Sequence, residues 1–334
     1  MESVLHGNTF ARIFGWTLSM LGITGNCIVI SLNCVRRKRK NHPNQQFNDG
    51  LLKARYTPSK ISKITLLLFT NLAISDLLTA LYLLIILSAD AYYDIHHGNY
   101  SQFENGTSSP LDLPNQWLKH PFCFIARFII QLTFHSSIGI SLIITTDRFI
   151  SINYPRSKYK ITDRIAKRSL LFFWLISFLN ALILLISSTQ LGEYNSWRVF
   201  VNLCVTADIN VIFIRVLSLL SIIWAIIATV IMAFMYLMIF KTVKSARLVL
   251  RSQRVVYERK ILKVAVIIVI ANIISWLPTA VAAVIRFTES PLYLDITYNK
   301  VIPILLMCLT MNAAINPLIY IFGSCKYFDR SHKA

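Results

Sequence analysis

The sequence predicts an all-α membrane protein built as a bundle of seven transmembrane helices. Of its 334 residues, 55% are apolar and only 15% are charged, whereas a soluble protein carries about 25% charged residues. Seven apolar stretches reach or approach the roughly 20 residues that a helix needs to cross about 30 Å of hydrocarbon. Lipid offers backbone polar groups no hydrogen-bond partner, so these groups must pair within the protein, as they do in a helix. The alternation of apolar and polar residues that a β-barrel needs is not evident, so helices are predicted.

The predicted spans form one membrane domain, residues 10–322, between a short outer segment, 1–9, and a short inner tail, 323–334. The first span begins too close to the start and runs too far for a cleaved signal peptide, so we expect an uncleaved anchor. The seven spans are residues 10–35, 64–87, 122–152, 169–187, 209–240, 261–285 and 301–322.

The positions of Lys and Arg predict the orientation. The loops after spans one, three and five and the C-terminal tail, with the adjoining helix ends, hold 27 of the 34. Short basic loops stay in the cytoplasm, so the N-terminus is predicted outside and the C-terminus inside a cell membrane. A net charge of +19 is also typical of nucleic-acid binders. Its distribution between apolar spans instead favours contact with anionic lipids, and no nucleic-acid partner is expected.

Two predicted loops are long. The first inner loop, 36–63, starts with five basic residues and contains Pro43, Gly50 and Pro58, a composition typical of a flexible linker. Its basic cluster either lies along the inner leaflet or simply stops membrane transfer. The first outer loop, 88–121, contains two acceptor triplets for N-glycosylation, at Asn99 and Asn105.

Asp76 lies in the middle of the second span, where a charge costs roughly 2.5–3.5 kcal/mol. We therefore expect it to face the bundle interior and to have polar partners. Four residues of other spans lie near the same depth and carry oxygen or amide groups: Asn26, Ser137, Asn312 and Asn316. They form either a site for a hard cation, which prefers oxygen ligands, or a hydrogen-bond network without an ion.

Two prolines predict places where helices bend. Pro317 in span seven and Pro278 in span six cannot donate a backbone hydrogen bond and disturb the preceding turn. Such kinks are hinges about which a helix swings, although prolines also occur in membrane helices that do not move. The polar groups beside them favour a switch.

Other chemistry finds little support in the sequence. No catalytic triad, metal-ligand spacing or phosphate loop is evident, so an enzyme is not predicted. A transporter or channel would show paired repeats, which are also not evident. His135 and Arg127 in span three and Arg215 in span five either face a ligand cavity or, for the arginines, extend toward the membrane surface.

Two motifs at helix ends carry a resemblance to a known family. Asp147-Arg148-Phe149 ends span three, and Asn316-Pro317-Leu318-Ile319-Tyr320 ends span seven. Together with the seven spans they resemble the rhodopsin-like (class A) G-protein-coupled receptors. The resemblance implies a receptor that transmits an extracellular signal to heterotrimeric G proteins through helix rearrangement.

The resemblance also implies roles for particular residues. Arg148 would pair with Glu258 in the resting state, and Trp276 and Tyr320 would move on activation. Asp76 and its polar neighbours would hold a sodium ion as an allosteric modulator, and no other cofactor is expected. A disulfide would join Cys123 to Cys204, as in the family.

Finer features resemble one group within the family. Span five lacks the usual proline, and Asn272 stands where most members have phenylalanine. Both features resemble the receptors with leucine-rich-repeat ectodomains, for relaxin-like peptides and glycoprotein hormones, and Trp276-Leu277-Pro278 is closer to the relaxin type. A peptide or protein ligand is therefore expected. The repeats themselves are absent from these residues, which leaves a non-signalling receptor fragment or decoy as the alternative.

Overall fold

The computed structural model describes most of the first three quarters of the chain and short pieces of the rest. The described residues are 4–5, 8–41, 63–100, 117–155, 157–189, 203–205, 212–246, 271, 274–275, 278, 281, 304, 307–308 and 310–319. The long helices among them are α1 (Thr9–Asn41), α2 (Lys63–Tyr100), α4 (Pro121–Asn153), α5 (Asp163–Thr189) and α7 (Ile212–Ala246). They correspond to the first five predicted spans.

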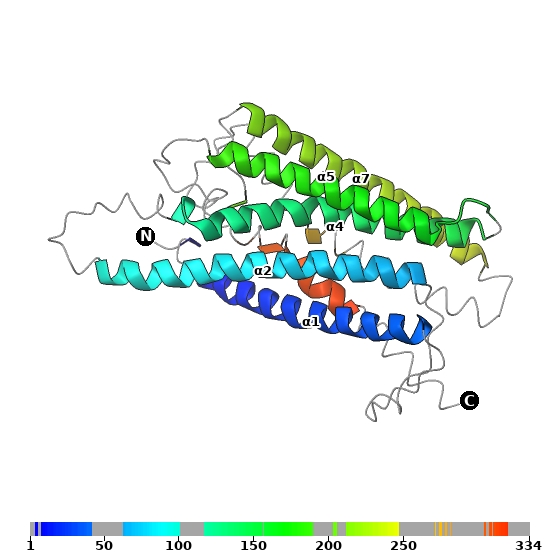
Figure 1. Ribbon diagram of the computed structural model, residues 1–334, viewed down its shortest axis with the longest axis horizontal. Helices are drawn as coiled ribbons and strands as arrows, with labels where there is room; N and C mark the ends of the chain where they lie inside the picture. The colour runs from blue at the N-terminus through cyan, green and yellow to red at the C-terminus, as the bar shows by residue number, and fades with distance from the viewer. Residues whose placement is uncertain are drawn as a thin grey trace, which may run out of the picture.

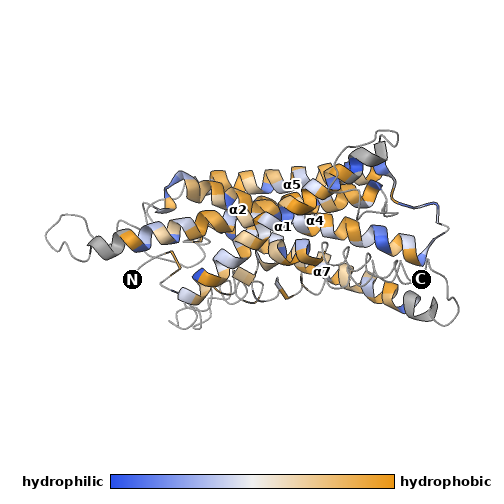
Figure 2. Ribbon diagram, turned by 90° about the horizontal axis from the view of Figure 1, so that it is seen from below, coloured by the Kyte–Doolittle hydropathy of each residue, from blue (hydrophilic) through white to orange (hydrophobic). Residues whose placement is uncertain are grey.

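All five helices are long and apolar enough to cross a membrane. Hydrophobic residues predominate along most of their length (Figure 2). The helical, membrane-spanning fold is therefore confirmed for this part of the chain. The sixth and seventh predicted spans are represented by short helical pieces, the longest being residues 310–319, which we call the span-seven segment.

The long helices lie side by side with roughly parallel axes, and α4 is central (Figure 1). Helix α1 packs on α2, α2 packs on α4, and α4 also packs against α5 and α7. The span-seven segment, red in Figure 1, contacts both α1 and α2 through buried side chains. This arrangement brings polar residues of four helices toward one interior.

Local sequence explains where several helices begin. The Asn8 side chain accepts a hydrogen bond from the backbone of Ala11 at the start of α1, at 3.0 Å. Pro121 occupies the first turn of α4, where its missing N–H costs nothing. Thr162 accepts from the backbone of Ile165 before α5. Each contact satisfies a donor that a helix start otherwise leaves unpaired.

Helices α1 and α2 extend well beyond the predicted ends of their spans, as α5 also does at its start and α7 at its end. Helix α1 continues to Asn41, so the basic residues 36–40 are helical and not part of a flexible linker. Arg and Lys are good helix formers, and the first breaker is Pro43. Helix α2 continues to Tyr100, through residues 88–100 of the predicted outer loop, and Asn99 lies in its last turn. Charged residues there do not end the helix, because Asp90 and Asp94, one turn apart, both bind Arg12 of α1.

The apolar core has two main clusters. One surrounds the start of α4 and includes Leu87 of α2, Trp117 and Leu203. The other joins α2, α4 and α5 through residues such as Leu72, Ile140 and Leu170. Toward the outside, α5 and α7 expose many large apolar side chains, as expected of surfaces that face lipid.

Candidate functional site

Asp76 of α2 is buried and bonded to the span-seven segment. Asp76 is 2% exposed, and Asn316 Nδ2 donates a hydrogen bond of 2.9 Å to Asp76 Oδ2. The prediction that Asp76 is buried and approaches Asn316 is confirmed. A donor and an acceptor from two helices thus pair in a region where lipid would leave each of them without a hydrogen-bond partner.

The surrounding amides join further helices. Asn26 of α1 donates from Nδ2 to the backbone oxygens of Gly22 and Ala313, at 2.8 Å each, and so connects α1 to the span-seven segment. Ser275, one of the described residues of span six, donates to Asn312 Oδ1 at 3.1 Å. Spans one, two, six and seven therefore meet through short polar contacts.

A small cavity lies beside this network. It has a volume of about 20 Å³ and is lined by polar and apolar residues of α2, α4 and the span-seven segment. Within the described part of the chain, the buried atoms Asn312 Nδ2 and Asn316 Oδ1 have no hydrogen-bond partner. The volume is enough for one water-sized occupant. The lining residues are Asp76, Thr79, Ile130, Thr133, Phe134, Ser137, Asn312 and Ala313.

Pro317 follows Asn316 and packs closely on α1. A Cβ placed on Gly25 would lie 2.7 Å from Pro317 Cγ, so this glycine permits the two helices to approach. The predicted hinge is thus adjacent to the polar network and in contact with α1. Pro278 of span six is helical and half-buried.

Arg148 lies at the far end of α4 from the disulfide. It donates to the carboxylate of Asp147, its neighbour, and from Nη2 to Thr65 Oγ1 of α2 at 2.6 Å. One turn earlier, Thr145 Oγ1 lies 3.4 Å from the hydroxyl of Tyr236 on α7. Phe149 packs edge-on against Tyr154. Thr65 is a partner that sequence reasoning missed, because a threonine at the start of an apolar span carries no distinctive pattern.

Several predicted site residues lie outside the described residues. These are Glu258, Trp276, Tyr320 and Asn105. The structure therefore does not test the predicted Arg148–Glu258 pair. The proposed roles of these residues stay predictions. For Asn99 the structure describes only the backbone, at the end of α2.

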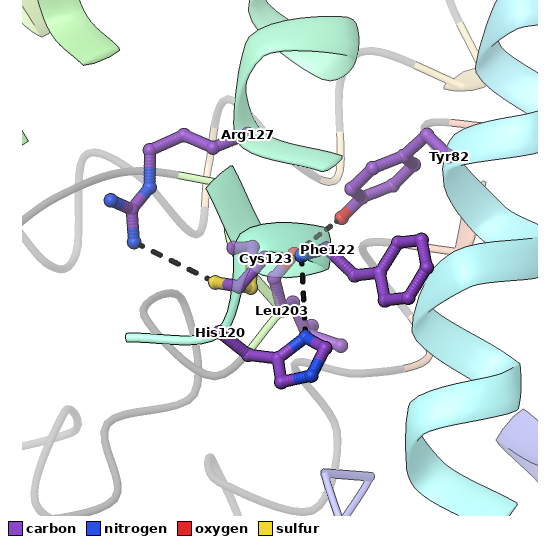
Figure 3. The surroundings of a disulfide bond; sticks show 7 residues. Tyr82, His120, Phe122, Cys123, Arg127 and Leu203 are labelled. Atoms are coloured by element: carbon purple, nitrogen blue, oxygen red, sulfur yellow. Dashed lines mark hydrogen bonds between the residues drawn. A yellow bond between two sulfur atoms is a disulfide. The ribbon is translucent and has the colours of Figure 1, made fainter. Parts of the chain in front are cut away.

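The disulfide between Cys123 and Cys204 is present, with a Cα–Cα distance of 5.5 Å. This confirms the pairing implied by the family resemblance. The hydroxyl of Tyr82 donates to Leu203 O at 2.8 Å, beside the disulfide (Figure 3). The guanidinium of Arg127, 1% exposed, points toward the same sulfur atoms, with Nη2 at 3.9 Å from Cys123 Sγ. Tyr82 was not predicted, since nothing in its sequence surroundings marks a partner 121 positions away.

Comparisons with known proteins agree with this geometry. Residues 51–320 match the family model described as 7 transmembrane receptor (rhodopsin family). The chain is 25% identical over 98% of its length to G-protein coupled receptor GRL101 of Lymnaea stagnalis, of which it covers 26%. It is 24% identical to the follicle-stimulating hormone receptor of Cairina moschata, over 94% of this chain and 38% of that protein. Against the lutropin-choriogonadotropic hormone receptor of Bos taurus it is 24% identical, over 96% of this chain and 41% of that protein.

The predicted resemblance to the glycoprotein-hormone receptor group is confirmed by these similarities. The leaning toward the relaxin type within that group stays a prediction. The chain spans about a quarter to two fifths of the length of these curated relatives.

Proposed function

Because the chain belongs to the rhodopsin family of seven-transmembrane receptors, we propose that it passes an extracellular hormone signal to heterotrimeric G proteins by rearranging its helices. The family comprises multi-pass receptors of the plasma membrane and not enzymes, so those two predictions are confirmed. The proposal goes further in naming the ligand class, the G-protein partner and the movement.

The Asp76–Asn316 contact is the observation that carries the proposal. It joins α2 to the span-seven segment one residue before Pro317, and among the described residues the neighbouring atoms Asn312 Nδ2 and Asn316 Oδ1 have no hydrogen-bond partner. A buried polar network holds the helices that it joins in one arrangement while its hydrogen bonds are satisfied. A helix that is hinged at a proline beside such a network suits a switch between two states.

The arrangement of α4 supports an orientation with the N-terminus outside. Its start carries the disulfide, which belongs in an oxidising compartment, and its end carries Arg148. The basic residues at the ends of α1 and α7, with those that follow α1, α4 and α7 in sequence, then lie inside, beside anionic lipids. Arg148 in turn faces the compartment that contains G proteins. In this proposal all seven predicted spans cross the membrane as helices.

The ligand class follows from the relatives. Two of those named above are receptors for follicle-stimulating hormone and for lutropin and choriogonadotropin. We infer that this chain, too, responds to a peptide or protein ligand. Because it covers only part of those proteins, it corresponds to the portion that transmits the signal through the membrane.

A sodium ion fits the cavity beside Asp76 as an allosteric modulator. The lining offers a carboxylate, hydroxyl groups and an amide, whose oxygen atoms are hard ligands. A bound cation would supply a positive charge that balances the buried carboxylate. Asp76, Ser137 and Asn312 of the lining would then be its principal ligands, and a change in their separation would alter its affinity.

The test is nucleotide exchange on purified G-protein heterotrimers by the full chain in lipid nanodiscs. Exchange above the rate without receptor supports the proposal. Arg148→Ala should abolish that increase, whereas Lys167→Ala, which removes an exposed cation paired with Asp163, should leave it unchanged. No exchange with any G-protein class, from a monodisperse and thermally stable preparation, would favour a non-signalling decoy.

A further inference from the structure

Three consecutive residues, 203–205, are fastened to two helices at the disulfide end of the bundle. Leu203 O accepts from the Tyr82 hydroxyl of α2 at 2.8 Å, Cys204 is bonded to Cys123 of α4, and Val205 O accepts from Gln131 Nε2 of α4 at 2.6 Å. Cys204 has φ of 51°, a left-handed conformation that non-glycine residues rarely adopt. We call residues 203–205 the lid.

The contact with Gln131 reaches further along α4 than the disulfide does. Gln131 lies eight residues, or about 12 Å of helix, beyond Cys123. Side chains of a helix lean toward its N-terminus, and α4 starts at the lid. The half-buried Gln131 amide is therefore directed back toward Val205, so that the lid is connected to a turn inside the bundle.

One turn further along α4, His135 continues the chain of contacts. Its Nδ1 lies 3.1 Å from the backbone oxygen of Gln131, and its Nε2 lies 3.1 Å from Ser221 Oγ of α7. A neutral imidazole has one N–H, and the Gln131 oxygen can only accept. Ser221 Oγ also donates to Leu217 O at 2.9 Å, and Asn180 Nδ2 lies 3.5 Å from His135 Nδ1, so the tautomer of His135 sets the direction of its bonds to Gln131 and Ser221. His135 is 8% exposed, so water does not compete freely for these bonds.

Helix α7 also meets α4 at its other end. The Tyr236 hydroxyl lies 3.4 Å from Thr145 Oγ1, three residues before Arg148. A shift of α7 at Ser221 would thus be felt near the arginine that the proposed function assigns to G-protein contact. The lid, α4 and α7 form one connected path between the two ends of the bundle.

We propose that Gln131, His135 and Ser221 transmit the position of the lid to α7. In this role they are positioning residues, which act through their contacts with the lid and with one another. The proposal rests on the proposed function, because it supplies a route by which an event at the outer surface reaches the inner end of the bundle. The test therefore measures the coupling between the lid and α7 directly.

The experiment follows α7 while the lid is loosened. The full chain carries one engineered cysteine, Lys241→Cys, at the exposed far end of α7, with the four cysteines outside the disulfide replaced by alanine. A bimane fluorophore attached there through a thioether withstands thiol reductant. Reduction of the Cys123–Cys204 bond in nanodiscs then frees one of the three fastenings of the lid, and the bimane emission reports any response of α7.

We expect reduction to change the emission of the reference protein. The change should be at least twofold smaller in Gln131→Met, which keeps the volume but removes the donor, and in Ser221→Ala. Ser221→Thr, which keeps a hydroxyl, should retain it. Tyr82→Phe, which loosens the lid from α2 only, is the matched control and should retain it as well.

Two outcomes overturn the proposal. One is an unchanged emission in the reference protein after complete reduction. The other is an equal change in Gln131→Met and Ser221→Ala, which would mean that the response travels along the α4 backbone. If Gln131→Met fails to fold, the Ser221→Ala and Ser221→Thr pair decides. No G protein takes part in this measurement, so its failure is distinct from failure of the proposed signalling.

Discussion

Replacing Asp76 by Asn should remove a stabilising effect of sodium on the receptor. The carboxylate is buried and its Oδ2 accepts from Asn316 Nδ2 at 2.9 Å. The charge costs roughly 2.5–3.5 kcal/mol at this depth, and a hydrogen bond to a charged group returns about 1.5–3 kcal/mol. Without a cation, Asp76→Asn should therefore leave the stability unchanged or raise it by up to about 2 kcal/mol.

Sodium changes this balance only where the carboxylate is present. The cavity of about 20 Å³ accommodates one small occupant. At a sodium concentration ten times the dissociation constant, binding adds about 1.4 kcal/mol to the stability of the folded state. For a chain of this size the unfolding temperature of the wild type should then rise by a few degrees, at about 2–4 °C per kcal/mol.

The assay is thermal unfolding in detergent, followed by tryptophan fluorescence, in sodium chloride and in N-methyl-D-glucamine chloride at equal ionic strength. Asp90→Asn is the matched control. Asp90 is also a buried carboxylate, but it lies toward the C-terminal end of α2 and is paired with Arg12. That variant should keep the sodium effect even if it is less stable. An equal sodium effect in wild type and Asp76→Asn would refute the assignment of a cation to this cavity.

Three further predictions concern the restraint, the packing and the disulfide. Glu258→Ala should raise ligand-independent second-messenger output, normalised to surface expression, because the proposed pair with Arg148 would be lost; output no higher than wild type would show that this pair is not the restraint. Gly139→Ala should lower stability by about 1–3 kcal/mol in thermal unfolding, since the added Cβ would lie 2.3 Å from Phe173 Cδ1, and a second change, Phe173→Leu, should recover part of the loss. Equal stability of Gly139→Ala and wild type would contradict that packing. Cys204→Ser should cost about 2–4 kcal/mol in the same assay. Equal stability of Cys204→Ser and the oxidised wild type would argue against a structural role of the disulfide.

The helix ends show where sequence patterns lose information. Hydropathy predicts where a chain enters hydrocarbon, but not where a helix stops once it has left. Helix α1 continues through its basic residues to Asn41, and α2 continues to Tyr100. The reason for α2 lies in another helix, because Arg12 of α1 binds Asp90 and Asp94 on one face of it. A contact between distant positions has no signature in a local pattern.

Sequence patterns alone establish that this protein lies in a membrane and which of its buried groups need partners. Apolar length decides the first, and the cost of an isolated charge in lipid requires that Asp76 turn inward whatever surrounds it. Only the tertiary structure selected Asn316 as the bonded partner, while Ser137 lines the adjacent cavity and Asn26 binds backbone oxygens. Only it brought Tyr82 and Gln131 to the lid and His135 to Ser221. Several residues at one depth satisfy the same chemical requirement, and the relative rotation and spacing of packed helices, set by close contacts such as that of Gly25 with Pro317, decide which of them meet.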